Sequence, residues 1–484
     1  CITLWRDRLL GIRIIFIVLL LGLGGVGLFV RYHNANGERN DSAFLQQTHK
    51  EYTLDFTNPA QSLFEPQNTH TLEVSADLLG EMNFFNNQNV FVPNTQKSAH
   101  SSSLLDLGDR LMVVFFAGSR EGARDVKIYQ SFLDKQNGVS SSWSESKPIL
   151  DAQMLSHLSG KFIKKLGNPV VFMDSKKRVH LFVVGVSLGG WATSKVYQLY
   201  FDEKLQSLHY VTELHLGAFA NLSHLVRTPP LELENGGFML PLYHELADKY
   251  PLVAFFNKDA KFLFAKRINS LKSQLQPTII ALDSTSCLAS YRIHHGYENF
   301  AFLQACQDFG NKWVEPLQSN IKNFDSSSVL LALDKEVLLL HNDGMNNPLL
   351  EFQNIYGKSV QIHPRASLSL FLLKNPNTFT RLLTIDVTQN GEVSYPCALL
   401  DSTHLHITYT HNREKIKYLK IPLDSIDELI AQARDIPPTP NKPQEKDEPL
   451  PKDKDSKESP YIYIDDMVIA QAKENLTNTP IEEM

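Results

Sequence analysis

Apolar residues follow a repeating pattern of paired strands from residue 101 to residue 412. Each unit opens with an apolar run, passes through a turn that contains Asp, Asn or Gly, and returns as a second apolar run. Short apolar runs bounded by turn residues are typical of β-strands. The units begin at Ser101, Asn168, Pro229, Gln276, Ser327 and Tyr395. Their turns carry an acidic residue each, at Asp106, Asp174, Glu234, Asp283, Asp334 and Asp401.

The repetition of this hairpin indicates the architecture. A further strand follows each hairpin, and no long helical period interrupts the units. Short strands at regular spacing predict an all-β fold, and a repeated hairpin-based unit favours a propeller over a sandwich. The pattern therefore predicts a six-bladed β-propeller. The further strands are expected at residues 126–132, 195–201, 252–257 with 261–265, 300–305, 368–373 and 415–421.

The segment Ile14–Val30 is uncharged and apolar, and it predicts a transmembrane helix. Arg6, Arg8 and Arg13 precede it, and no small-residue cleavage site follows it. The positive-inside rule then places the N-terminus in the cytoplasm. We therefore expect a single-pass, membrane-anchored protein whose propeller lies on the periplasmic or extracellular side.

Composition divides the chain into five regions. Residues 1–31 form the expected N-terminal membrane anchor, 32–68 a polar spacer and 69–423 the propeller. An amphipathic stretch predicts a C-terminal helix at 424–436. Residues 437–484 are rich in Pro and in charges of both signs, which predicts a disordered tail.

Charge and motif content exclude several functions. The net charge of −6 and the lack of a dense Lys/Arg run argue against nucleic acid as a partner. No HExxH, P-loop or dinucleotide motif occurs, so we expect neither a metal ion nor a cofactor. Cys287 and Cys306 flank one hairpin at opposed positions. A disulfide fits this placement, but two buried free thiols are the commoner arrangement and are expected here.

Residues 306–313, CQDFGNKW, have the spacing of the sialidase Asp box, S-x-D-x-G-x-x-W, with Cys in place of Ser. In such a turn the Asp accepts backbone hydrogen bonds, the Gly supplies a positive φ and the Trp packs between blades. A looser copy, spread by insertions, runs from Ser131 to Trp143. Both copies are expected to be structural and to lie on the face opposite the functional site.

The wider pattern resembles the bacterial predicted-neuraminidase family, which comprises sialidase-like proteins with BNR/Asp-box repeats. The resemblance covers about residues 100–421, and it implies a six-bladed sialidase propeller. The chain departs from the family at Gly167, where members have Trp, and at Thr228-Pro229-Pro230, where they have Asn-Lys-Pro. The segments that carry the resemblance are FFAGSREGARDVKIY from Phe115, GNPVVF from Gly167, VRTPPLELENGGFMLPLYHE from Val226, QPTII from Gln276, SYRI from Ser290, VLLLHND from Val337 and SYPCALLDSTHLHITYTHNREKIKYLKI from Ser394.

The resemblance implies an exo-α-sialidase with a retaining mechanism. Arginines would hold the carboxylate of the sugar, because the guanidinium fork binds a carboxylate in a bidentate manner. Sialidases use a Tyr nucleophile, a neighbouring Glu takes its proton, and a separate acid protonates the leaving oxygen. The expected clamp is Arg120, Arg292 and Arg365, the nucleophile Tyr395, its base Glu245 and the acid/base Asp125. Glu121, His100 and Asn168 are further pocket candidates, and Glu298 is an alternative base.

Each of these residues also has an ordinary structural interpretation. Arg120 with Glu121 or Asp125 would form an ion-pair cluster that ties a loop, and any single Arg is most often a surface residue. The strand ends of successive blades meet on one face of a propeller, so convergence of these residues is the discriminating feature. The alternatives to a sialidase are a glycan-binding or scaffolding propeller without catalysis, and a hydrolase for another sugar.

Overall fold

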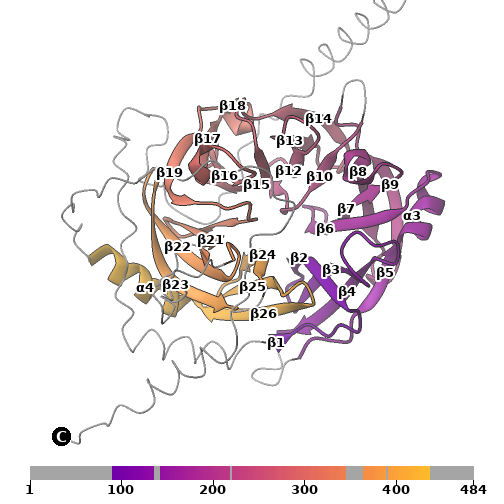
Figure 1. Cartoon of the computed structure of the whole chain (residues 1–484), viewed down its shortest axis with the longest axis horizontal. Coiled ribbons are helices and arrows are strands. Elements are labelled where there is room, and N and C mark those ends of the chain that lie inside the picture. The colour runs from indigo at the N-terminus through magenta and orange to yellow at the C-terminus, as the bar shows by residue number, and fades with distance from the viewer. Residues whose placement is uncertain (1–89, 136–141, 218–220, 345–362, 389–390, 436–484) are drawn as a thin grey trace, which may run out of the picture.

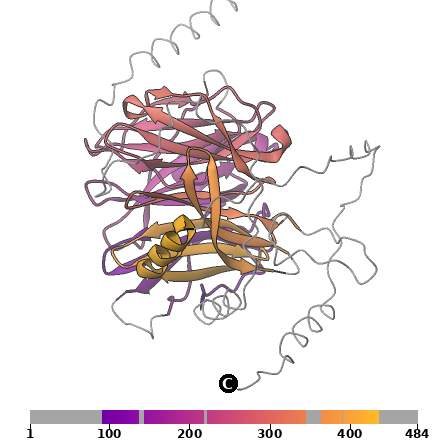
Figure 2. The ribbon, with the colours of Figure 1, turned by 90° about the vertical axis from the view of Figure 1, so that its left-hand side faces the viewer.

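The computed structural model describes residues 90–135, 142–217, 221–344, 363–388 and 391–435, and these residues form six antiparallel sheets around a central axis (Figure 1). The predicted all-β six-bladed propeller is therefore confirmed. The strands of each sheet follow chain order outward from the axis, except in the last sheet, whose outermost strand comes from the start of the described chain. The first strands of neighbouring sheets contact each other. The side view shows the sheets as blades packed face to face (Figure 2).

The six blades begin with the predicted hairpins. Blade 1 holds β2 (Ser98–Asp106), β3 (Arg110–Gly118), β4 (Lys127–Asp134) and β5 (Lys147–Asp151). Blade 2 holds β6 (Lys165–Met173), β7 (Val179–Val186), β8 (Ser194–Phe201) and β9 (Leu208–Glu213). Blade 3 holds β10 (His224–Val226), β11 (Leu231–Glu232), β12 (Phe238–His244), β13 (Tyr250–Phe256) and β14 (Phe262–Arg267).

The second half of the ring repeats this order. Blade 4 holds β15 (Gln274–Ala281), β16 (Cys287–Ile293), β17 (Phe300–Gln307), β18 (Lys312–Trp313) and β19 (Leu317–Lys322). Blade 5 holds β20 (Val329–Leu333), β21 (Glu336–Asn342), β22 (Ser367–Asn375) and β23 (Thr378–Val387). Blade 6 holds β24 (Val393–Leu400), β25 (His404–His411) and β26 (Lys415–Pro422).

An N-terminal strand completes blade 6. β1 (Val90–Phe91) pairs with β26 in the register Val90 to Tyr418 and Phe91 to Lys417. The first described residues thereby cover the outer edge of the last blade, which would otherwise present unpaired backbone groups. The sequence predicts one or two strands within residues 72–92 that lead into the propeller, but it does not predict this pairing, because nothing in the local pattern records which strand accepts them.

Apolar residues fill the space between neighbouring blades. Six separate clusters of buried residues occur in the described chain, one between each pair of adjacent sheets. In β21, Leu338 and Leu340 pack toward blade 6, while Val337 and Leu339 pack toward blade 4. Because successive side chains point to opposite faces of a strand, a strand between two sheets must be apolar at consecutive positions. This requirement explains the continuous apolar runs in the sequence.

Acidic turns hold the hairpins at the end of the ring opposite the site. Four of the predicted acidic residues accept backbone hydrogen bonds within their own turn. Their side chains thus satisfy the amides that the tight turn leaves unpaired. These four are Asp106, Asp174, Asp283 and Asp401.

The Asp-box turn has the positive φ at Gly and the packed Trp that its sequence predicts. Asp308, Phe309 and Gly310 all have positive φ, and the Trp313 Nε1–H donates to the Gly310 carbonyl at 2.9 Å. Gly310 lies against Met239 of blade 3, so the turn seals blades 3 and 4 together. In the looser copy, Trp143 is buried and packs edge-on against Tyr418 of blade 6 at 5.2 Å. Both tryptophans therefore pack between blades.

Two helices lie outside the blades. α4 (Leu423–Asp435) packs Ile426, Ile430 and Ala433 onto the cluster between blades 5 and 6, where the sequence predicted a helix at 424–436. α3 (Ala152–Ser159) links blades 1 and 2 and was not predicted. Its N-cap Asp151 accepts from the Met154 amide at 2.8 Å, and Gly160 ends it in a left-handed conformation.

The predicted anchor, the polar spacer and the tail lie at residues 1–89 and 436–484, outside the described residues. Within the described part, no helix is long and apolar enough to cross a membrane.

Cys287 and Cys306 form a disulfide, so the expectation of two free thiols was wrong. They are directly opposed Cα partners on β16 and β17, 4.9 Å apart. This separation lies within the usual disulfide range, and the pairing follows from the register of the hairpin. Cys397, the free cysteine in the described part of the chain, is buried on the inner strand β24.

The disulfide is expected to stabilise the propeller. It closes a loop with a sequence separation of 19, and loops of that size contribute about 3 kcal/mol. Reduction with dithiothreitol should therefore lower the free energy of unfolding by about 3 kcal/mol, measured by urea denaturation. The double variant Cys287→Ala/Cys306→Ala should start from the lower value and show no response to the reductant. Equal stability of the oxidised and reduced protein would contradict this role.

Candidate functional site

A local irregularity recurs in the innermost strands at the site face. Ser101, Asn168, Gln276 and Tyr395 have φ between 40° and 55°, and the strand register shifts at each of them. Three of them precede a proline, in Asn168-Pro169, Gln276-Pro277 and Tyr395-Pro396. A bulge re-aims the side chain that it carries. Three of these side chains then meet in one hydrogen-bonded chain at the axis.

That chain joins four blades. The Asn168 amide donates to the Tyr243 hydroxyl at 3.1 Å, and the Gln276 amide donates to the hydroxyls of Tyr243 and Tyr395 at 3.4 and 3.3 Å. Arg292 completes the chain, because its Nη1 donates to the Tyr395 hydroxyl at 2.9 Å. Asn168, Tyr243, Gln276 and Tyr395 are all buried.

Three guanidinium groups surround the Tyr395 ring. The Cζ atoms of Arg227, Arg365 and Arg292 lie 5.1, 5.9 and 6.0 Å from its centroid. These arginines come from blade 3, the β21–β22 connection and blade 4, so the fold brings together residues that are far apart in the sequence. A cation over an aromatic face is attracted by the ring quadrupole. Tyr395 is 8% exposed.

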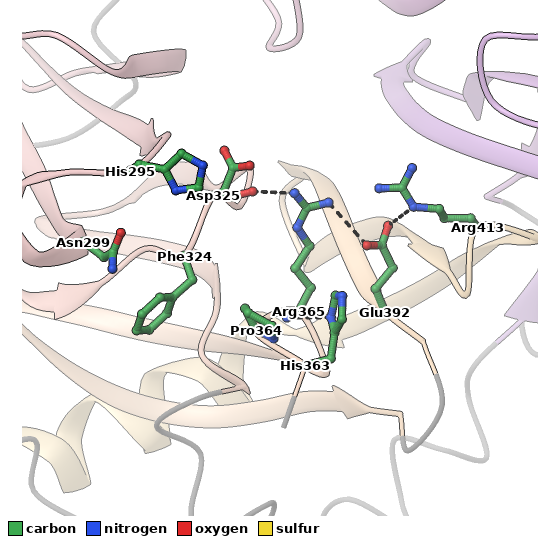
Figure 3. Close-up of a pocket in the computed structure, with 9 residues that line it drawn as sticks. All are labelled: His295, Asn299, Phe324, Asp325, His363, Pro364, Arg365, Glu392 and Arg413. Carbon is green, nitrogen blue, oxygen red and sulfur yellow. Dashed lines mark hydrogen bonds and ion pairs between the residues drawn. The ribbon is translucent and has the colours of Figure 1, made fainter. Parts of the chain in front are cut away.

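Carboxylates hold Arg292, Arg365 and a further arginine, Arg413; Figure 3 shows the pairs of Arg365 and Arg413 with Glu392. Arg292 Nε lies 2.7 Å from Asp325 Oδ1, and Arg365 Nη1 lies 3.3 Å from Glu392 Oε2. Arg365 also donates to the Asp325 carbonyl at 2.5 Å. Arg413 Nε lies 2.9 Å from Glu392 Oε1, so Glu392 sits between two guanidinium groups. The same Arg413 reaches Glu121 of the β3–β4 loop through Nη1.

A cavity of about 430 Å³ opens beside this network. Asp325, Arg365, Glu392 and Arg413 line its charged wall, as the close-up shows (Figure 3). His295, Asn299, Phe324, His363 and Pro364 complete the lining. Fixed guanidinium donors in such a lining suit a polar ligand that bears negative charge.

Burial and ion pairing set the charge states of these groups. Burial alone would raise the pKa values of Asp325 and Glu392, but the neighbouring arginines lower each to about 2. Burial alone would lower the pKa of Arg292, but the neighbouring Tyr395 and Asp325 raise that pKa. All these groups therefore stay ionised at neutral pH, and the arginines are fixed before any ligand arrives.

Arg227 closes the axis beneath Tyr395. It is fully buried, and its guanidinium donates to the Ser102 carbonyl at 3.3 Å and to the Pro396 carbonyl at 2.8 Å. These bonds tie the inner strands of blades 1, 3 and 6 to one another. On the other side of Arg227, residues of all six blades line a second cavity of about 360 Å³ with a mainly apolar wall.

His100 is buried against Tyr395 with unsatisfied nitrogens. Its ring centroid lies 4.2 Å from the Tyr395 ring and 5.5 Å from the Phe116 ring. Neither ring nitrogen has a hydrogen-bond partner among the described residues. Burial lowers the pKa of His100 well below its usual value, and nearby arginines lower it further against the opposing effect of Glu392. The imidazole is therefore neutral.

The structure gathers part of the predicted site. Tyr395, Arg292 and Arg365 converge, with His100 against the tyrosine ring, and Asn168 belongs to the same hydrogen-bonded chain. Glu121 joins through Arg413. The three residues at the heart of the sequence hypothesis are thus close to one another, and the ordinary surface interpretation of Arg292 and Arg365 does not hold, because their side chains are 12% and 11% exposed.

Other predicted residues lie apart from this cluster. Arg120 and Asp125 are exposed in the β3–β4 loop, where both Asp125 oxygens accept from Ser119 at 2.9 Å. The Ser119 hydroxyl holds the pKa of Asp125 below its usual value, which is the wrong direction for an acid. Glu245 is half-buried. Burial raises the pKa of Tyr243, and the charge of Glu245 raises it further. Glu298 is exposed on the 3₁₀ turn η4 (Tyr297–Asn299). Their predicted roles stay predictions.

Six residues of the cluster were missed from the sequence: Arg227, Tyr243, Gln276, Asp325, Glu392 and Arg413. Arg413 lies within the most specific segment of the resemblance, and Glu392 lies two residues before it. Gln276 shares the X-Pro bulge of Tyr395, so that repeated dipeptide was a usable signal. Arg227 and Asp325 lie between predicted strands and carry no comparable local mark.

Gly167 has a structural explanation. A Cβ atom there would lie 2.9 Å from the Trp191 ring, which comes from the β7–β8 loop. Trp191 therefore occupies the space next to this position, at a site where the family has its own Trp.

The part of the chain that the structure describes contains no group of three His, Cys, Asp or Glu side chains suited to a metal ion.

Comparisons with known proteins agree with this architecture. The sequence profile of the BNR repeat-like domain matches residues 109–407. A search of curated proteins finds no match. A protein of unknown function from Dyadobacter fermentans DSM 18053 superposes with a TM-score of 0.51 at 12% identity, over 69% of this chain and 97% of that one.

Two sialidases are also similar in structure. The Hadza microbial sialidase Hz136 superposes with a TM-score of 0.52 at 12% identity, over 68% of this chain and 66% of that chain. The Trypanosoma rangeli sialidase in complex with sialic acid gives 0.49 at 11% identity, over 72% and 59%. At such identities the likeness concerns the fold alone. The profile match, which spans most of the propeller, shows that the chain belongs to the BNR repeat-like domain family, with a sialidase-like six-bladed propeller fold.

Proposed function

We propose that this chain binds a terminal acidic sugar, with sialic acid as the first candidate, and acts on it as an exo-sialidase. The observation that carries the proposal is the convergence of Arg292 and Arg365 around the Tyr395 phenol beside an open cavity. A Tyr among fixed cations is the arrangement that a sugar with a carboxylate at its reacting carbon requires, since a carboxylate nucleophile would be repelled.

The charge of the cluster favours one carboxylate. The cluster contains four arginines and three carboxylates, so its formal charges sum to one positive charge. The arginines are Arg227, Arg292, Arg365 and Arg413, and the carboxylates are Glu121, Asp325 and Glu392. His100 is neutral and adds none. Guanidinium groups that already have partners keep free N–H donors, because each has five. A sugar carboxylate would neutralise the remaining charge in a partly buried place, where it is weakly screened.

The proposed reaction uses the sugar carboxylate as an anchor. With that group on Arg292 and Arg365, the Tyr395 oxygen would attack the anomeric carbon and displace the aglycone oxygen, and water would then release the sugar with retained configuration. Asp125 as the acid would have to leave Ser119 when substrate binds, since that contact keeps the carboxyl ionised. Arg120, on the same loop, would approach the sugar in that movement.

A glycan-binding propeller that does not hydrolyse its ligand is the second candidate. The observation that favours it is the amide of Gln276 at the Tyr395 hydroxyl, where a sialidase requires a base. Both candidates share the acidic-sugar site and differ only in turnover.

We also propose that the propeller works outside the cytoplasm. The Cys287–Cys306 disulfide supports this location, because disulfides persist in oxidising compartments. The apolar segment Ile14–Val30, preceded by arginines, supports attachment to the membrane with the N-terminus in the cytoplasm.

The carboxylate clamp can be tested by binding. Arg292→Gln and Arg365→Gln should each weaken binding of N-acetylneuraminic acid by about 10- to 100-fold, because a charged hydrogen bond is worth about 1.5–3 kcal/mol. Isothermal titration calorimetry measures the change. The methyl ester of the sugar should bind weakly to the unmodified protein, and Arg267→Gln on the outer strand β14 is the matched control. Equal binding of acid and ester would refute the clamp.

The role of Tyr395 can be tested by turnover. The unmodified protein should release 4-methylumbelliferone from its α-sialoside, and Tyr395→Phe should reduce the rate by at least about 100-fold while it still binds the sugar, because only the attacking oxygen is lost. Tyr200→Phe on the outer strand β8 serves as the control. Undiminished release by Tyr395→Phe would exclude this nucleophile.

A further inference from the structure

Gln276 lies between two tyrosine hydroxyls at the centre of the site. Its Nε2 is 3.3 Å from the Tyr395 oxygen and 3.4 Å from the Tyr243 oxygen, and its side chain is buried. We infer that Gln276 occupies the place of the proton acceptor for Tyr395 and thereby makes this site bind an acidic sugar well and hydrolyse it slowly. The inference rests on the proposed function and adds which residue sets the balance between binding and turnover.

Hydrogen-bond accounting supports the inference. An amide nitrogen has two hydrogens, and Gln276 can donate one to each tyrosine. Arg292 Nη1 donates to the same Tyr395 oxygen at 2.9 Å. That oxygen therefore accepts two bonds, and its own proton must point elsewhere. In either orientation of the amide, the group cannot take up a proton at neutral pH, because a carboxamide is not a base in water.

The neighbouring titratable groups do not replace the missing base. Asp325 and Glu392 have pKa values of about 2 and are held by arginines, so they accept a phenol proton poorly. The pKa of His100 is also low, and its nitrogens make no hydrogen bond to Tyr395 among the described residues. Glu245, the base that the sequence predicted, influences Tyr243, and Gln276 separates that hydroxyl from Tyr395.

The chemical step shows why this matters. The Tyr395 oxygen forms a bond to the anomeric carbon with one of its electron pairs, and the bond from that carbon to the aglycone oxygen breaks with its pair on oxygen. The phenolic proton must leave, and the aglycone oxygen must gain one. Without a base at position 276 the attacking oxygen keeps its proton until late in the step, which forgoes an assistance worth about 100- to 10,000-fold.

The test is to supply the carboxylate. Gln276→Glu should hydrolyse 4-methylumbelliferyl α-sialoside at least about tenfold faster than the unmodified protein, with binding of N-acetylneuraminic acid retained to show that the site is folded. The gain should vanish in Gln276→Glu/Tyr395→Phe. Gln318→Glu makes the same chemical change on β19 (Leu317–Lys322) of the same blade and should alter nothing.

A second variant covers poor folding of Gln276→Glu, which buries a new charge. Gln276→Ala should be accelerated by added sodium formate, whose carboxylate enters the vacated space, while the unmodified protein is not. Two results would show that the inference is wrong while the proposed function stands. In the first, the unmodified protein and Gln276→Glu both bind the sugar and turn it over at equal rates. In the second, formate has no effect on Gln276→Ala. If neither protein binds N-acetylneuraminic acid, the proposed function fails and the inference falls with it.

Discussion

The site depends on a backbone constraint in the innermost strands. A strand that continued regularly past Asn168, Gln276 and Tyr395 would alternate its side chains between the neighbouring blades, as the outer strands do. The shift in register and the positive φ at these residues break that alternation and bring their polar ends together at the axis. The apolar packing between blades can hold this irregularity because it continues unbroken on both sides.

Buried cations impose the next constraint. A guanidinium removed from water is costly unless it is paired, and removal of one partner from a buried pair leaves an uncompensated charge. Glu392 serves two arginines, Asp325 serves Arg292 directly, and the carbonyls of Ser102 and Pro396 serve Arg227. The pairing keeps the guanidinium groups in place without ligand, so the protein meets the cost of ordering them during folding and not during binding. The same pairing lowers the pKa values of the two carboxylates and makes them unsuitable as bases.

The sequence predicts the fold because the rules that build blades are local. Apolar runs, acidic turns and the CQDFGNKW turn each act within a few residues, and the structure reproduces them. The closure by β1 was missed because its partner strand is remote in the sequence. The helix α3 was missed because it is only eight residues long, too short for a clear helical period. The disulfide was undervalued for a related reason: the register of the hairpin decides it, and that register emerges only when the hairpin forms.

The cluster was predicted less completely than the fold, and the reason is physical. Arg292 and Arg365 were found because strand ends on one face converge whatever the local detail. The X-Pro dipeptide marks Gln276 locally, but the contacts that Gln276 and Arg413 make cross between blades, and no window of sequence contains those. The residues chosen for proton transfer, Glu245 and Asp125, were selected by charge and order along the chain. Proton transfer depends on hydrogen-bond distance and on pKa, and neither follows from order.

The contrast between the two halves of the site bears on how such a propeller is used. In one half of the site the cations are paired with carboxylates, and two of them, Arg365 and Arg413, line one cavity. In the other half an amide meets the phenol, and Asp125, the predicted acid, lies apart from the cluster, where Ser119 lowers its pKa. Recognition needs only the first half, whereas hydrolysis needs the side chains of both halves positioned to within about 0.5 Å. Under the proposed function, a site that fixes the first half this firmly holds an acidic sugar. Turnover then depends on whether the β3–β4 loop can bring an acid to the aglycone. Among the contacts described for the site, Glu121 and Arg413 tie that loop to the rest.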